Sequence, residues 1–144
     1  MSYVYVIAPV VGYLSAGGLK FAINSLKARN LAVSEIGLGG FPSTHTTVVS
    51  SILFLIGLRE GLSSPLLGIA IALNLVVIID AMDLRRKVGR HAHVINRLAR
   101  LQQPDVSSPA LRERMGHSPL EVLGGFLTGL TVALILDRID RSLF

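Results

Sequence analysis

The sequence predicts an all-α integral membrane protein: a bundle of four transmembrane helices with an amphipathic helix on the cytoplasmic side. Three observations predict it. The chain is 51% hydrophobic and only 16% charged, with a mean hydropathy of +0.60, which is unusual for a soluble domain. Four apolar runs approach the length of a membrane-spanning helix. The longest polar segment carries arginines between regularly spaced apolar residues. With 144 residues, the chain is expected to form a single membrane domain, 1–144.

The four apolar runs define the expected spans. A spanning helix needs roughly 20 mostly apolar residues. The second and third runs are short, but each can gain a turn from its flanks. The runs are Tyr3 to Leu19 with a continuation to Leu26, Thr44 to Leu58, Pro65 to Ile79, and Pro119 to Leu136. The first run lacks a basic segment before it, so we expect it to be retained and not cleaved as a signal peptide.

The connections between the runs differ in length and charge. Residues 59–64 predict a tight turn, whereas residues 83–117 form a long basic segment. Within it, "LRRKVGRHAHVINRLARLQ" has apolar residues at helical spacing with arginines between them, which predicts an amphipathic helix at the membrane surface. Those apolar positions are Leu84, Val88, Ala92, Ile95 and Leu98. A short helix from Ala110 to Met115 is expected to follow.

The basic residues orient the expected bundle. Loops 27–43 and 83–117 share one side and carry ten of the 14 Lys and Arg residues, against three on the other side; Lys20, inside the first run, completes the set. The positive-inside rule therefore places both large loops in the cytoplasm and both termini outside. Basic membrane proteins also use such charge to hold anionic lipids or substrates. The chain has no cysteine, which excludes disulfides and thiolate metal sites.

The stretch "GGFPSTHT" precedes the second run. Gly40 permits close backbone approach, and Ser43 after a proline is typical of a helix start. A helix N-terminus offers free N–H groups to an anion. His45 lies in the first turn, beside Thr44. The stretch is thus either an anion cradle with a titratable acid or an ordinary capped helix with an incidental histidine.

The stretch "GHSPLE" repeats this arrangement before the fourth run. Glu121 lies four residues after His117, so its carboxylate can reach back and fix the imidazole tautomer. Ser118 and Glu121 also have the spacing of a capping box. The two interpretations are compatible.

Three further charged positions lie on the same predicted side. Lys20 lies within an apolar run, where it either snorkels to the interface or faces a polar interior. Asp80 and Asp83 are three residues apart and could share Mg²⁺, or simply end the third helix before Arg85 and Arg86. His91 and His93 are interpreted as surface residues.

Together, "GGFPSTHT", "DAMDLRRKVGRHAHVIN" and "MGHSPLEVLGG" resemble the divergent branch of the type 2 phosphatidic acid phosphatase family, which is related to vanadium-dependent haloperoxidases. The resemblance extends from about Leu19 to Leu136. It implies that His117 is a nucleophile that forms a phosphohistidine, that Glu121 orients it, and that His45 protonates the leaving alkoxide. Lys20 and an arginine would hold the phosphoryl oxygens.

The sequence departs from the family pattern in the phosphate clamp. The family arginine six residues before the nucleophile is replaced by Leu111, so its role would pass to Arg112 or Arg114, or to Arg85 and Arg86. Glutamate replaces aspartate at Glu121, and threonine replaces glycine at Thr44. Four spans are fewer than the six usual in lipid phosphatases, which leaves open a site completed by a second subunit in a homo-oligomer.

The resulting hypothesis is a membrane phosphatase that hydrolyses a lipid or isoprenoid phosphate at the cytoplasmic leaflet, with phosphatidylglycerophosphate, phosphatidate and polyprenyl phosphates as candidate substrates. It needs no cofactor or metal, and no nucleic-acid partner is expected. Two alternatives are a Mg²⁺-dependent phosphatase or phosphotransferase that uses Asp80 and Asp83, and a non-catalytic membrane lipid-binding protein. The residues assigned to substrate binding are Lys20, Gly40, Ser43, Thr44, Asp80, Arg85 and Arg86.

Overall fold

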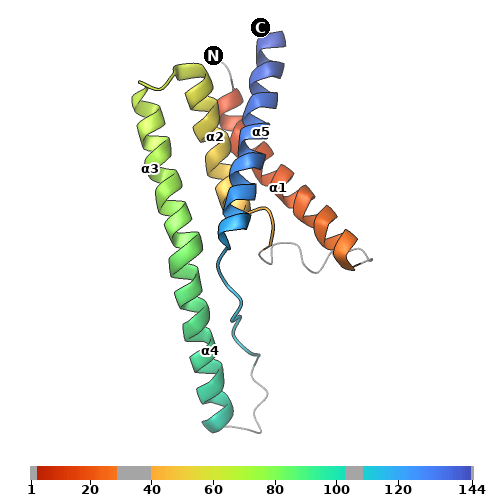
Figure 1. The fold of residues 1–144 in the computed structure, drawn as a ribbon, viewed down its shortest axis with the longest axis vertical. Coiled ribbons are helices and arrows are strands. Elements are labelled where there is room, and N and C mark those ends of the chain that lie inside the picture. The colour runs from red at the N-terminus through yellow and green to blue at the C-terminus, as the bar shows by residue number, and fades with distance from the viewer. Residues whose placement is uncertain (1–2, 29–39, 103–108, 144) are drawn as a thin grey trace.

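The computed structural model is all-α, and it describes residues 3–28, 40–102 and 109–143. The helices are α1 (Val4–Ala28), α2 (Thr44–Glu60), α3 (Pro65–Ile79), the π-helical segment η2 (Asp80–Leu84), α4 (Arg85–Gln102) and α5 (Pro119–Leu143). α1, α2, α3 and α5 are grouped together, and α4 extends away from them (Figure 1). Arg29, one of the ten basic residues counted on the cytoplasmic side, and Gly39, the first residue of the motif "GGFPSTHT", lie outside the described residues.

Three helical segments among the described residues are long and apolar enough to cross a membrane. They are Val4–Lys27, Pro65–Gln102 and Pro119–Leu143. α2 has 17 residues and is the central helix, because it contacts α1, α3 and α5. The all-α class predicted from the sequence is therefore confirmed.

Small residues let α5 approach α2 closely. Gly125 and Gly129 are four residues apart and lie on one face of α5. A side chain at Gly125 would collide with Thr46, and one at Gly129 would collide with Ser50. This spacing of glycines is common where membrane helices pack backbone to backbone. Ser50 Oγ also donates to the carbonyl of Gly125 at 3.3 Å, so the interface contains a polar contact as well as close packing.

α1 packs on α2 through a second stripe of small residues. Ala8, Gly12 and Ala16 repeat every four residues, and Ala8 and Ala16 are fully buried. Ser51 Oγ donates to the carbonyl of Ala8 at 3.1 Å. The next position of the same stripe is Lys20, since residues four apart share a helix face. Packing of α1 on α2 thus brings the Lys20 side chain to the N-terminus of α2.

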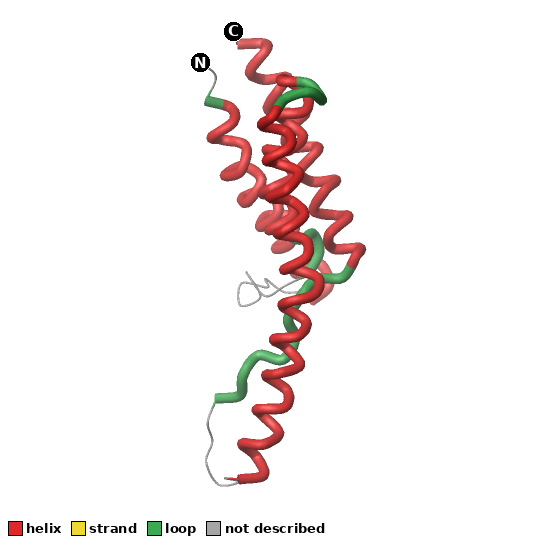
Figure 2. Tube along the Cα trace, turned by 90° about the vertical axis from the view of Figure 1, so that its left-hand side faces the viewer, coloured by secondary structure: helices red, strands yellow, loops and turns green. Residues whose placement is uncertain are grey.

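α3 continues through η2 into α4 along nearly one direction (Figures 1 and 2). The sequence between Gly68 and Gly89 contains neither glycine nor proline, so nothing ends the helix at the last apolar residue. The expected amphipathic helix is present at Arg85–Gln102. The prediction that it lies along the membrane surface is wrong, because it continues from α3 and projects away from the bundle. Residues 65–84 span about 30 Å at 1.5 Å per residue, roughly the thickness of a hydrocarbon core.

The chain returns to the bundle along α4 in residues 109–118, here called the return segment (Figure 1). The short helix expected from Ala110 to Met115 is wrong, because this stretch has no helical turn. The amide of Asn96 on α4 donates to the Leu111 carbonyl at 2.8 Å and accepts from the Leu111 N–H at 2.9 Å. Backbone groups that a helix would use internally are therefore paired with α4.

Candidate active site

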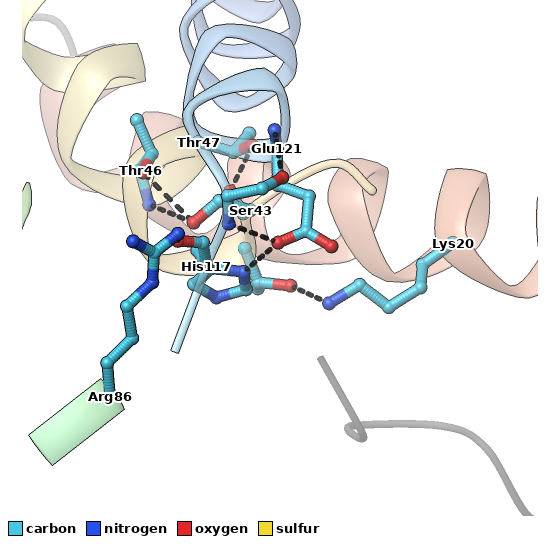
Figure 3. A network of polar contacts seen from close by, with 9 residues as sticks. Lys20, Ser43, Thr46, Thr47, Arg86, His117 and Glu121 are labelled. Carbon is cyan, nitrogen blue, oxygen red and sulfur yellow. Dashed lines mark hydrogen bonds and ion pairs between the residues drawn. The ribbon is translucent and has the colours of Figure 1, made fainter. Parts of the chain in front are cut away.

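Polar side chains from four parts of the chain meet at the end of the bundle nearest α4 (Figure 3). His45 lies in the first turn of α2, and His117 lies at the end of the return segment. Their ring centroids are 6.2 Å apart, with an angle of 59° between the ring planes. Lys20 Nζ donates to Thr44 Oγ1 at 3.0 Å, which brings α1 to the same place. The convergence expected from the sequence is therefore present in the structure.

His117 is buried and is held through its backbone and its ring. Its N–H donates to the carbonyl of Ala81 in η2 at 2.9 Å, and its carbonyl accepts from Arg86 Nη2 at 3.1 Å. The preceding Gly116 has φ +90°, and a side chain there would collide with Arg86. A left-handed backbone and close packing both favour glycine at this turn. The sequence GH thus fixes where the histidine points.

Glu121 makes both of the contacts considered for it. Its Oε2 lies 3.1 Å from His117 Nδ1 and accepts from the Ser118 N–H at 2.8 Å. The Glu121 N–H donates to Ser118 Oγ at 3.3 Å, which completes a reciprocal capping box at the start of α5. The carboxylate engages Nδ1, so Nε2 is the ring nitrogen left for other chemistry.

Ser43 has a structural position. It is fully buried, and its Oγ accepts from the Thr46 N–H at 3.4 Å, so it caps α2. Its own N–H donates to the Glu121 carbonyl at 2.8 Å, which joins the starts of α2 and α5. Gly40 provides the turn before this cap, with φ +92°. Both residues, expected to bind substrate, lie outside the cavity wall described next.

A cavity of about 830 Å³ opens beside the two histidines. This volume falls within the usual range for ligand sites. Its wall has a polar end and an apolar part. The part of the cavity beside the α1 residues Tyr13, Leu14, Gly17, Gly18 and Phe21 is here called the arm. The polar end comprises Lys20, Asn24, Thr44, His45, Arg85, Arg112 and His117, and the rest comprises Tyr13, Leu14, Gly17, Gly18, Phe21, Val48, Val49, Val77, Met115 and Gly116. Among these described residues there are three cations and no carboxylate.

The three cations reach the cavity from different elements. Lys20 is buried on α1, and Arg112 comes from the return segment, where its Nε donates to the Arg114 carbonyl at 3.3 Å. Arg85 comes from the start of α4, and its Nε is held by Asp80 Oδ2 at 2.7 Å. Arg86 does not line this cavity; it holds the backbone of His117. Of the arginines considered for the clamp, the structure therefore brings Arg85 and Arg112 to the wall.

Asp80 and Asp83 each contact a different cation. Asp80 pairs with Arg85, and Asp83 Oδ2 lies 2.8 Å from Lys87 Nζ. Within the described part of the chain, no group of three or more His, Cys, Asp or Glu side chains is arranged to hold a metal ion. Asp80, expected to bind substrate, is absent from the cavity wall and contacts Arg85, which lines it.

Lys20 is the one cavity residue of α1 that was predicted from the sequence. Gly17 and Asn24 lie three and four residues from it, and Tyr13 lies one turn further. That spacing is the signal that could have found them, because side chains three or four residues apart share a helix face. Listing the residues three and four positions from Lys20 along the helix would have identified these cavity residues.

Comparison with known proteins gives one family and one named relative. A family described as the Divergent PAP2 family matches residues 1–132. The chain is 31% identical to the uncharacterized membrane protein YuiD of Bacillus subtilis (strain 168) over 132 residues, which covers 82% of this chain and 84% of that protein. No solved structure matches the chain significantly.

Proposed function

The chain belongs to the divergent PAP2 family, and on that premise we propose that it is a membrane phosphatase acting on a lipid or isoprenoid phosphate monoester through a phosphohistidine at His117. One observation carries the proposal: the ring centroids of two imidazoles from separate elements lie 6.2 Å apart on the wall of a cavity that also has three cations on its wall. Two imidazoles that line one cavity can serve a phosphoryl group between them, one as the nucleophile and the other as the acid.

The reaction follows from the contacts of each ring. Glu121 holds the proton of His117 on Nδ1, so Nε2 presents its lone pair to phosphorus. As the N–P bond forms, the bond from phosphorus to the ester oxygen breaks, and His45 donates a proton to the leaving alkoxide. Water then attacks the phosphohistidine while His45 accepts its proton. Inorganic phosphate leaves, and both histidines return to their starting states.

The cations supply the electrostatic part of catalysis. Charge accumulates on three equatorial oxygens during phosphoryl transfer, and catalysis consists mainly of positioning and charge stabilisation. Lys20, Arg85 and Arg112 line the cavity, and no carboxylate on the described wall competes with the substrate. Arginine can bind two phosphate oxygens with one guanidinium. All of these groups come from one chain, so a homo-oligomer is not needed to complete the site.

The membrane placement supports a lipid substrate. α2 is read as the fourth span; it is short, but the other three spans surround it. The excess of Lys and Arg at the cavity end assigns that end to the cytoplasmic leaflet. The phosphate of phosphatidylglycerophosphate, phosphatidate or a polyprenyl phosphate would then reach the cations while its tail stays in the bilayer.

The test is a phosphate-release screen with purified protein over these three lipid phosphates, with and without a chelator. The proposal expects turnover that persists in the chelator and is inhibited by vanadate, which mimics the transferred phosphoryl group. Loss of turnover in the chelator would instead favour the alternative that uses Mg²⁺ at Asp80 and Asp83. Binding without any phosphate release would favour a lipid-binding protein that has no catalytic activity.

A further inference from the structure

Two adjacent glycines of α1 lie on the cavity wall without a packing reason. A Cβ at Gly17 or Gly18 would meet no atom within 4 Å. Gly12 of the same helix is different, because a Cβ there would lie 3.0 Å from Ser51 Oγ. Close approach to α2 therefore explains Gly12 but not the other two. Glycine weakens a helix interior relative to other residues, so its use at these positions needs another explanation.

The space beside these glycines connects the polar end of the cavity to the outside of the bundle. Tyr13, Gly17 and Lys20 follow one another on the same face of α1 and all line the cavity. From Lys20 to Tyr13 the helix rises about 10 Å, at 1.5 Å per residue. Tyr13 and Leu14 are 61% and 64% exposed, so the arm opens sideways where α1 would face lipid. Val48 of α2 and Val77 of α3 form apolar wall across from it.

From this geometry, and resting on the function proposed above, we infer that the arm beside Gly17 and Gly18 holds the part of the substrate tail nearest the phosphate. The ligand is a phosphate monoester that carries a long hydrocarbon chain. Its phosphate lies at Lys20, and its first methylenes lie against the bare face of α1. The arm extends about 10 Å from Lys20, and a long tail makes van der Waals contacts along its whole length that a short tail cannot make, so the arm selects long chains over short ones. The two glycines set the width of the arm.

The test replaces each glycine with leucine and compares the turnover of substrates with long and short tails. Gly17→Leu and Gly18→Leu fill the arm, and leucine is a better helix former than glycine, so the helix should tolerate it. Gly68→Leu is the matched control: Gly68 lies on α3 outside the cavity wall, and a Cβ there also meets no atom within 4 Å. The readout is the ratio of kcat/KM for dioleoyl phosphatidate to that for dihexanoyl phosphatidate.

The inference expects this ratio to fall at least tenfold in Gly17→Leu and Gly18→Leu and to stay at the wild-type value in Gly68→Leu. A ratio that is unchanged in both cavity variants, or that falls equally in the control, would overturn it. The same comparison with geranylgeranyl phosphate and a five-carbon prenyl phosphate separates isoprenoid from diacyl tails. Selectivity lost for one pair alone identifies the tail that the arm accepts.

Failure of the proposed function gives a different result. If the wild-type protein hydrolyses none of these compounds, the phosphatase proposal fails, and the tail site is tested by binding alone. Fluorescent phosphatidate in detergent micelles is titrated with wild-type protein, Gly17→Leu and Gly68→Leu. Weaker binding by Gly17→Leu alone supports the tail site. Equal binding by all three proteins contradicts it.

Discussion

The two ends of the bundle carry similar charged residues in different arrangements. At the end where both termini lie, Arg59 contacts Asp137 at 2.8 Å and Asp140 at 2.7 Å, and Asp137 also contacts Arg141 at 2.9 Å. At the other end, Lys20 contacts a threonine hydroxyl and lines an open cavity together with two arginines. The first end pairs Arg59 and Arg141 with carboxylates, whereas at the second end Arg85 is the one cavity cation with a salt bridge among the described residues, to Asp80, and Lys20 and Arg112 face the cavity without one.

This difference separates structural charge from charge that can bind a ligand. A buried charge is costly unless it is paired, and the ion pairs beside Arg59 meet that requirement within the protein. Lys20 is as buried, but its hydrogen bond is to the neutral Thr44 hydroxyl, and the nearby Glu121 carboxylate is already bound by His117 and the Ser118 N–H. A negatively charged substrate would complete the second arrangement. Burial of a charge therefore indicates a site only when the protein does not supply the opposite charge.

The largest effect is expected from removing the nucleophile. His117→Asn keeps a similar size and polarity but cannot form a phosphohistidine, so phosphate release should fall to background. His91→Asn is the control, because His91 is exposed on α4 and lies outside the cavity. Full turnover by a folded His117→Asn protein would show that His117 is not the nucleophile.

A smaller loss is expected from removing the acid. His45→Ala should lower kcat by about 10²–10⁴-fold with an alkyl phosphate, because the alkoxide then leaves without a proton. In kcat/KM, which reports the steps up to formation of the phosphohistidine and excludes the later attack of water, a nitrophenyl phosphate should be much less affected, because its leaving group needs no proton. An equal loss of kcat/KM on both substrates would show that His45 does not act as the acid.

The opposite end should affect stability and not chemistry. Asp137→Asn removes one of the two carboxylates that contact Arg59 and the carboxylate that contacts Arg141, and it should lower the free energy of unfolding by about 2 kcal/mol. Unfolding in a denaturing detergent measures this, with the exposed neighbour Arg138→Gln as the control. Protein that remains folded should keep its turnover. A loss of kcat without a loss of stability would contradict the division between the two ends.

The smallest effect is expected outside both ends, where the return segment meets α4. Hydrogen bonds from Asn96 and then His93 lower the pKa of Glu113 from its ordinary value of 4.5. Stability from this carboxylate is therefore complete above about pH 4.5 and is lost as the pH falls through the lowered pKa. Melting temperatures of the wild type and Glu113→Gln should differ at pH 7 and converge toward pH 3. A constant difference at both pH values would exclude this contribution.

Most of the fold could be predicted because each helix carries its own signals. Ser64 and Pro65 mark the start of α3, which runs from Pro65 to Ile79 as expected. α5 continues to Leu143, beyond the expected Leu136, and the salt bridge between Asp137 and Arg141 along the helix supports this last part. The prediction ended too early because it followed hydropathy, which falls at these charged residues. The return segment could not be predicted, since Asn96 pairs with Leu111 across 15 residues.

The site could be predicted less completely than the fold. The side of the membrane on which Lys20, His45 and His117 lie follows from counting spans, and the structure brings them together. Which side chains reach the cavity depends on helix rotation and on local bonds. Ser43 is turned inward by its contact with Thr46, and Arg112 reaches the wall from a segment without regular structure. Neither position can be read from spacing.

The most direct test of the account is to identify the phosphorylated residue during turnover. Protein mixed with a lipid phosphate is quenched within milliseconds at alkaline pH, which preserves phosphohistidine, and its peptides are examined by mass spectrometry. The account predicts phosphate on His117, with more of it trapped when vanadate is absent and none in His117→Asn. Turnover without phosphate on any histidine, or with phosphate on a residue outside the cavity, would contradict it.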